Sequence, residues 1–361
     1  MTTQTVTSAN SPTASSGGIA NWLNVSVRGW QLASLVVALV ALAPIAVVAL
    51  AWLTPTADVW QHLGTTVLPD LLRNTGVLLV GVGLGVMIIG VGLGWLVATC
   101  DFPGRRFFDW ALMLPLAVPA YVLAFALIGI FDYSSPFQNQ LRVWFGPGFA
   151  LPPIRSTGGV ILAMVLAFYP YVYMLARTAF LSQGQSMLET GRVYGLTAWQ
   201  SFWRVALPMA RPAIAAGVAL ALMETLADFG AVSGFNYDTF TTAIYKAWFG
   251  MFNLAAAAQL ASLLLLFVVV GLVAEQRLRG RAQYHLTPKS TRSHRYRLHG
   301  GRSLAAATAC ALVFILAFAL PVGELLVWAV RSALQDFDVR YLRFVANTLV
   351  HGLAGRGKSL S

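Results

Sequence analysis

Two carboxylates inside an apolar stretch are the residues of this sequence best suited to chemistry. Glu224 and Asp228 are four residues apart, which predicts that they share one face of a helix. A charge near the bilayer centre costs about 2.5–3.5 kcal/mol, so the pair should face a bundle interior, a partner or a water-filled path. Carboxylates suit hard, oxygen-seeking cations such as Fe(III). The pair is predicted to contact a cation in such a path; the alternative is a structural pair that bonds to neighbouring helices or lies near the outer interface.

A tyrosine pair and two prolines are candidates for the same path. Tyr169 and Tyr173 share a helix face, and phenolates bind ferric iron, although tyrosine packing at a helix crossing is commoner. Pro170 lies between them and predicts a kink. Pro115 and Pro119 predict bends that help to shape a cavity in another apolar segment.

Two further sequence features could suggest an enzyme site, but the surrounding sequence does not support either one. Residues 352–359 fit the phosphate-binding pattern GxxxxGK[ST], but that loop works only between a strand and a following helix. The tail interrupts an expected span, which favours a frameshifted or truncated end. The five histidines are scattered, with no zinc-type or serine-hydrolase arrangement. We expect no enzyme activity and no cofactor bound by this chain, and the sequence identifies no metal ligands.

The composition places these residues in a membrane protein. Of the 361 residues, 58% are hydrophobic and only 10% are charged, against about 25% charged in soluble domains. The net charge of +11 could suggest nucleic acid, but the basic residues lie between long apolar runs, which is typical of cytoplasmic loops. Two cysteines, Cys100 and Cys310, offer no disulfide framework. The sequence predicts an all-α, polytopic transmembrane helix bundle that binds no nucleic acid.

A spanning helix needs about 20 apolar residues. Seven segments meet this requirement, and an eighth begins near Phe344 and stops almost at once. In the second segment, Gly81, Gly85, Gly90 and Gly94 form two small-xxx-small pairs that predict close helix packing. The seven predicted spans are 31–53, 74–99, 108–131, 158–181, 209–232, 253–275 and 304–330.

The distribution of basic residues predicts the orientation. Eight Lys and Arg residues lie in the connection 276–303, so this connection should be cytoplasmic. Counting back along the spans also puts Arg105, Arg106 and Arg204 inside, and the N-terminus with them. Residues 1–29 lack the features of a signal peptide and are expected to form a flexible cytoplasmic tail.

An internal repeat predicts the domain organisation. A proline-containing span, a polar stretch and an Asn-Thr pair recur at an offset of about 275 residues, with Asn74-Thr75 matched by Asn347-Thr348. We therefore expect one complete six-helix unit over 30–275, a basic linker over 276–303, and the incomplete start of a second unit over 304–361.

The loop between the fourth and fifth spans carries the most informative motif. Residues 184–208 read as a short helix, a break at Gly195, and a second short helix ending near Pro208. Trp199, Phe202 and Trp203 should give the second helix an exposed apolar face that docks to another protein. The alternative is an amphipathic helix that lies on the membrane.

This loop resembles that of the permease subunits of ABC importers. Their motif is Glu-Ala-Ala, three residues, Gly, nine residues, Ile-x-Leu-Pro, and Glu189, Gly195, Leu207 and Pro208 match it in identity and spacing. Thr190, Gly191 and Val205 depart from it by small-for-small or aliphatic exchanges. The stretches 207–217, 223–230 and 241–249 are similar to the ferric-iron branch, whose members typically hold two six-helix units in one chain.

The resemblance implies a six-helix core of the type I importer class, plus one to two extra helices, in a bacterial inner membrane. It implies that Glu189, Gly195, Leu207 and Pro208 couple the chain to a dimer of cytoplasmic ATPase subunits, which hold the ATP. It further implies an extracytoplasmic binding protein that delivers Fe(III), and a second permease core, here missing or on another chain.

Three alternatives remain open at this stage. The substrate could be a polyamine, thiamine or an oxyanion, carried by an importer with the same loop. The chain could be a secondary transporter or channel that works without an ATPase. It could also be an inactive fragment, because it looks C-terminally truncated relative to the fused two-core permeases.

Overall fold

The computed structural model describes residues 17–54, 60–61, 63–193, 195, 197–279, 295–336, 343 and 346–348. Within these residues, seven helical segments are long and apolar enough to cross a membrane, which confirms the all-α transmembrane fold. The segments are Trp30–Leu53, Gly64–Thr99, Ala120–Phe145, Thr157–Ser182, Trp199–Ala227, Leu254–Val273 and Gly301–Ala333.

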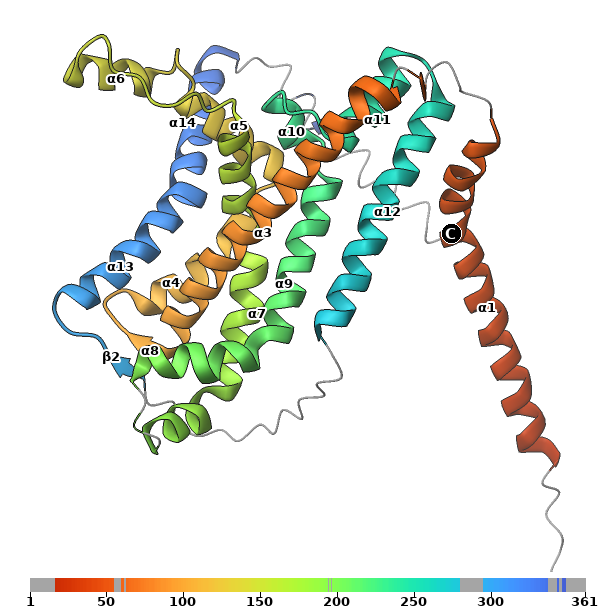
Figure 1. Ribbon diagram of the computed structural model, residues 1–361, viewed down its shortest axis with the longest axis horizontal. Coiled ribbons are helices and arrows are strands. Elements are labelled where there is room, and N and C mark those ends of the chain that lie inside the picture. The colour runs from red at the N-terminus through yellow and green to blue at the C-terminus, as the bar shows by residue number, and fades with distance from the viewer. Residues whose placement is uncertain are drawn as a thin grey trace, which may run out of the picture.

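The centre of the bundle is formed by α3 (Leu68–Thr99), α7 (Thr157–Val193) and α9 (Leu207–Ala227), which pack side by side (Figure 1). Glycines bring the three backbones together. A Cβ atom on Gly90 would lie 2.6 Å from the Cβ atom of Val172, and one on Gly217 would lie 2.7 Å from the Cα atom of that valine. Close packing through the α3 glycines, which the sequence predicts, is confirmed.

The third predicted span, 108–131, is wrong as a continuous helix. The chain forms α4 (Arg105–Ala111), a 3₁₀ turn η3 (Leu114–Ala117) and then α5 (Ala120–Phe131). Pro115 and Pro119 lack the amide hydrogens that a continuous helix would use, so the bends predicted at these prolines are confirmed. Beyond α5 the chain turns into a separate helix, α6 (Pro136–Phe145).

The fifth predicted span, 209–232, ends early. Helix α9 stops at Ala227 because Asp228 adopts an extended conformation, with φ −72° and ψ 125°. A short helix α10 (Gly230–Gly234) follows, then α11 (Phe240–Tyr245), a π-turn η5 (Lys246–Gly250) and the sixth span α12 (Leu254–Arg279). Asp228 therefore does not share a helix with Glu224.

Helix α1 (Gly17–Leu50) stands apart from the bundle at the right of Figure 1. The expectation of a flexible tail over 1–29 is wrong from Gly17 onward, because the backbone there is already helical. The turns η1 (Ala51–Leu53) and η2 (Leu63–Val67) follow α1. The side chain of Trp52 fastens this end of α1 to α12 by donating to Ser262 Oγ at 2.8 Å.

The seventh span packs on the opposite side of the bundle. It consists of α13 (Gly301–Phe314), a π-turn η6 (Ile315–Ala319) and α14 (Leu320–Asp336), which contact α4, η3 and α5. Gly129 on α5 leaves room for the Trp328 ring, and Phe314 meets Phe107 edge to face at 5.4 Å. The start of the repeat is thus a packed part of the first bundle.

A short strand pair ties the basic linker to this bundle. Strand β1 (Cys100–Asp101) pairs in parallel with β2 (Tyr296–Arg297), and the Leu298 amide donates to the Asp101 carbonyl at 3.1 Å. We call the end of the bundle that carries these strands, with Arg105, Arg106 and Arg204, the basic end. It is the lower end in Figure 1.

Several expectations fall outside the described residues. These are the phosphate-loop-like stretch 352–359, most of the eighth candidate span, and the first 16 residues of the tail.

Replacement of Gly217 by alanine should destabilise the bundle, because the new methyl group would meet the Val172 backbone. Overpacking of this kind costs about 1–3 kcal/mol. The matched control is Gly92→Ala on α3, where nothing lies within 4 Å of the added atom. Thermal unfolding in detergent should show a lower Tm for Gly217→Ala and an unchanged or higher Tm for Gly92→Ala. Equal Tm values for the two variants would contradict the packing.

Candidate functional site

An acidic cavity of about 400 Å³ lies where the η3–α5 bend meets α7 and the end of α9. Both charged residues in its wall are carboxylates, Glu224 and Asp228. The pair that the sequence selected therefore does meet at one site, although the two residues come from different elements. The remaining wall is formed by Leu116, Val118, Pro119, Ala120, Tyr121, Ala167, Phe168, Tyr171, Ala227, Phe229 and Gly230.

The position of Asp228 follows from its role at the start of α10. Its carboxylate Oδ1 accepts a hydrogen bond from the Ala231 amide at 2.7 Å, which satisfies a free donor of the first turn of that helix. A residue that caps the next helix has non-helical backbone angles, so its backbone cannot continue the preceding helix. Glu224 and Asp228 therefore meet at the cavity from two different elements and do not share the helix face that the sequence had suggested.

Tyr169 and Tyr173 pack at a helix crossing, which is the commoner of the two arrangements that the sequence left open. Tyr169 and Tyr173 are both fully buried: the Tyr169 hydroxyl donates to the Leu112 carbonyl at 2.9 Å, and the Tyr173 hydroxyl donates to the Asp109 carbonyl at 3.0 Å. Neither residue lines the cavity. Tyr171 does, and it lines the same wall as Glu224. Helical periodicity places Tyr171 on the other face of α7, so the sequence pointed to the wrong face.

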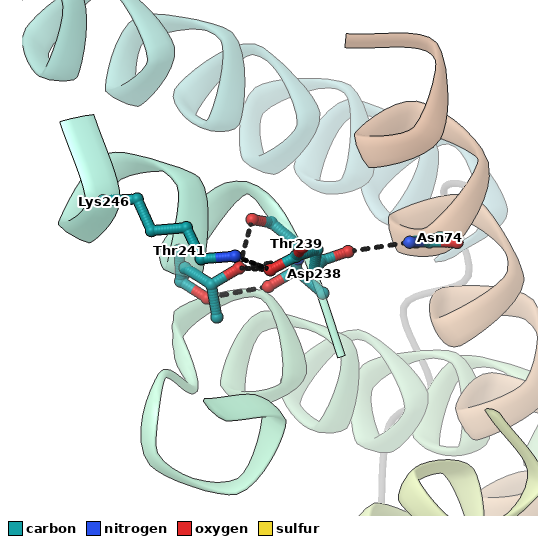
Figure 2. A network of polar contacts seen from close by, with 6 residues as sticks. Asn74, Asp238, Thr239, Thr241 and Lys246 are labelled. Atoms are coloured by element: carbon teal, nitrogen blue, oxygen red, sulfur yellow. Dashed lines mark hydrogen bonds and ion pairs between the residues drawn. The ribbon is translucent and has the colours of Figure 1, made fainter. Parts of the chain in front are cut away.

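A polar network around Asp238 and Thr239 (Figure 2) is connected to the cavity through Asp228. Thr241 Oγ1 donates to the Asp228 carbonyl at 2.9 Å, which satisfies a group freed by the end of α9. Lys246 pairs with the Asp238 carboxylate at 2.6 Å, and Asn74 on α3 donates to the Asp238 carbonyl at 3.1 Å. Sequence reasoning missed this support. The recurring Asn-Thr pair of the repeat could have pointed to this network, because the side chain of Asn74 joins α3 to the loop after α10.

The electrostatics of the cavity favour positive charge. Glu224 and Asp228 are close enough to repel each other, and the cavity wall, which consists entirely of described residues, holds no Lys, Arg or His. A site lined by one sign of charge concentrates ions of the opposite sign. Within the described residues, no group of three or more His, Cys, Asp or Glu side chains could hold a metal ion. The oxygens of Glu224, Asp228 and Tyr171 form an open contact site, which differs from a metal cage.

The loop at the basic end has the break that its sequence predicts. Gly195 has φ +68°, a left-handed conformation that glycine adopts without steric cost. Before it, α7 runs on to Val193, so the first short helix is a continuation of the fourth span. After it come α8 (Ala198–Ser201) and a π-turn η4 (Phe202–Ala206). The side chain of Glu189 lies outside the described part of the chain.

The second short helix does not end near Pro208, as the sequence had predicted. It runs through η4 directly into α9, whose first residue is Leu207, and Pro208 occupies the first turn of α9. A π-turn uses i→i+5 hydrogen bonds, so the break in register allows the helix to accommodate a proline without an amide hydrogen.

One aromatic residue anchors this loop and two others stay exposed. Phe202 is 8% exposed and meets Trp95 of α3 with ring centroids 4.9 Å apart. Trp199 and Trp203 are 67% and 52% exposed and pack on each other edge to face. The prediction that all three residues form an exposed face is wrong for Phe202. The remaining tryptophans form an apolar surface of a kind that serves protein contact.

Comparison with known proteins assigns the chain to a family. The family described as "Binding-protein-dependent transport system inner membrane component" matches residues 90–280, more than half of the chain. The chain belongs to this family, the membrane permeases of ABC importers, and is a multi-pass inner-membrane protein. The resemblance drawn from the loop motif is thereby confirmed.

Individual relatives are named for different substrates. The Fe(3+)-transport system permease protein FbpB 2 of Haemophilus influenzae is 29% identical over 290 residues, which cover 79% of this chain and 53% of that protein. The molybdenum transport system permease protein ModB of Escherichia coli K12 is 30% identical over 141 residues, or 39% of this chain and 60% of the relative. The sulfate transport system permease protein CysT of the same strain is 31% identical over 138 residues, or 38% and 48%.

A solved structure supports the fold. A bacterial ABC transporter involved in the import of the acidic polysaccharide alginate superposes with a TM-score of 0.58 at 17% identity, covering 73% of this chain and all of that one. The chain spans about half the length of the iron-transport relative.

Replacement of Phe202 by alanine should release the loop from α3 and α7. The variant loses the contacts with Trp95 and Phe180, so amides 197–206 should exchange hydrogen faster. Hydrogen exchange read by mass spectrometry measures this change. Trp203→Ala is the matched control, because that ring is half exposed, and it should leave the exchange rates close to wild type. Equal protection in both variants would show that Phe202 is not the anchor.

Proposed function

We propose that this chain is the membrane-spanning permease of an ATP-driven importer of ferric iron. The observation that carries the proposal is the acidic cavity, in which Glu224 and Asp228 are the charged wall residues. Fe(III) is a hard cation that prefers carboxylate and phenolate oxygens, and Glu224, Asp228 and Tyr171 supply these donors. The similarity to a relative named for Fe(3+) transport, over 79% of this chain, supports the same substrate.

The oxyanion alternative fits this cavity less well. A sulfate ion carries two negative charges, and two carboxylates in one wall would repel it. Sites for such anions use Arg side chains or helix N-termini with free amides. In this wall the α10 N-terminus is already occupied by the Asp228 carboxylate. The similarity to the permeases named for molybdenum and sulfate therefore supports the transport class, and the charge of the cavity wall favours a cation.

Weak binding suits transport through such a site. A carrier that holds its ion in a complete cage would release it slowly, whereas two carboxylates and a tyrosine allow the ion to enter and to leave. Glu224 is exposed within the cavity and Asp228 is half-buried, so both carboxylates are within reach of an ion in the cavity.

We further propose that the basic end faces the cytoplasm, with the N-terminus on the same side, and that the loop before α9 docks to a dimer of ATPase subunits. The exposed Trp199 and Trp203 provide the apolar contact. Glu189, Gly195, Leu207 and Pro208 match the coupling motif, and α9 runs directly from the loop to the cavity. ATP hydrolysis then belongs to the partner, a binding protein delivers the ion from outside, and a second permease core completes the path by rigid-body alternation.

Removal of either cavity carboxylate should reduce ferric-ion import. We expect Glu224→Gln and Asp228→Asn each to lower the uptake of radiolabelled ferric iron at least tenfold in cells that supply the ATPase, the binding protein and the second core. Asp70→Asn is the matched control, because Asp70 is exposed at the start of α3 and lies outside the cavity. Uptake of sulfate or molybdate in place of iron by the wild-type transporter would overturn the substrate assignment.

A Gly195→Ala substitution should uncouple transport from ATP hydrolysis. The left-handed conformation at this position costs an L-residue roughly 1–2 kcal/mol, so the loop should lose its shape. We expect the loaded binding protein to stop stimulating ATPase activity, while the Tm falls no further than that of Gly217→Ala. Import by the chain without any ATPase, driven by an ion gradient, would instead establish a secondary transporter.

A further inference from the structure

Helix α6 buries a glutamine and exposes several large apolar side chains. Gln138 is 2% exposed, whereas Trp144 is 69% exposed and Phe145 is 66% exposed. A buried polar residue beside a cluster of exposed large apolar residues is a departure from ordinary protein surfaces that needs a cause. The cause must be a non-aqueous partner for the exposed side.

The protein itself holds α6 in this orientation. The Gln138 amide nitrogen donates to the Phe131 carbonyl at the end of α5 at 2.7 Å, and its oxygen accepts from the Leu151 amide at 3.3 Å. Ser135 caps the helix by accepting from the Gln138 amide at 3.1 Å. These bonds hold Gln138 against the bundle, so the side of α6 that carries Trp144 is directed away from it, together with the exposed Asn139 and Gln140.

The apolar side is a continuous helical face. At 100° per residue, Phe137, Leu141, Trp144 and Phe145 fall within an arc of about 100°. Asn139 and Arg142 lie on the other side of the helix, where Arg142 stacks on the Tyr133 ring at 4.2 Å. Helix α6 thus has the amphipathic pattern of a helix that lies on a membrane surface.

The place of α6 in the bundle matches this pattern. It lies at the end opposite the basic end, in contact with α5, and it runs across the direction of the spanning helices (Figure 1). The spans reach the lipid headgroups at this level. Tryptophan and other aromatic side chains are enriched in that zone, because they combine apolar area with polarity at their edges.

We propose that α6 is an interfacial helix whose apolar face lies in the headgroup region of the bilayer on the side opposite the basic end. The lipid surface is its partner. Because α6 follows α5 after only four residues, and the first turn of α5 forms part of the cavity wall, the anchor holds that wall at a constant depth in the membrane. The face is set sideways to the spans, which fits lipid better than a protein that docks from the water.

Spin labels on the two sides of α6 test the proposal in the full-length chain in phosphatidylglycerol-containing proteoliposomes. Trp144→Cys places a label on the apolar face and Asn139→Cys places one on the polar side. The native Cys100 and Cys310 are buried at 6% and 0% exposure, so they should not react with the label. Power saturation with oxygen, which concentrates in lipid, and with a water-soluble nickel complex reports the surroundings of each label.

We expect the label at position 144 to be at least threefold more accessible to oxygen than to the nickel complex, and the label at 139 to show the reverse. Equal nickel access at both positions would place α6 in water and overturn the proposal. A label at 144 that neither reagent reaches would show a protein cover, such as the second core, and would also overturn it. Phe145→Cys repeats the measurement if Trp144→Cys fails to fold.

Discussion

The structure depends on one constraint: in a lipid bilayer, every backbone amide and carbonyl must find a partner within the protein. The two helix interruptions, at 112–119 and at 228–229, obey it through side chains. The η3 turn frees the carbonyls of Asp109 and Leu112, which accept from Tyr173 and Tyr169 respectively. The end of α9 frees the Asp228 carbonyl, which accepts from Thr241. The buried tyrosines that resembled iron ligands are thus the groups that make the bend in the third span possible.

The two interruptions meet, and their meeting creates the cavity. Residues 116–121 approach α9 from one side, and the turn at 228–230 closes the other, so polar atoms gather where continuous helices would have packed side by side. The glycines of α3 and α9 complement this arrangement. They bring the three central backbones into contact, and at Gly217 the contact lies beside the cavity residue Tyr171.

Helix α9 connects the two candidate sites. It begins at Leu207 in the loop of the basic end and ends at Ala227 beside the cavity, a distance of about 31 Å for 21 residues. An α-helix transmits displacement along its axis with little compression, so a partner that moves the loop also moves the cavity wall. Phe202, wedged against Trp95 and Phe180, passes the same displacement to α3 and α7. In the proposed function, the contact with an ATPase and the contact with an ion lie at the two ends of this one helix.

The sequence alone determined the membrane class, the number of spans, the loop break at Gly195 and the family, because these depend on local composition, spacing and glycine geometry. It also selected Glu224 and Asp228, since charge in an apolar stretch is visible without a fold. Only the tertiary structure decided which tyrosine faces the cavity, that Asp228 caps α10, that Phe202 is buried, and that the seventh span packs on α5. Each of these outcomes depends on a partner distant in the chain: Leu112 for Tyr169, Thr241 for Asp228, Trp95 for Phe202 and Trp328 for Gly129. Periodicity describes one helix at a time and carries no information about the carbonyl or ring that a neighbouring helix will present.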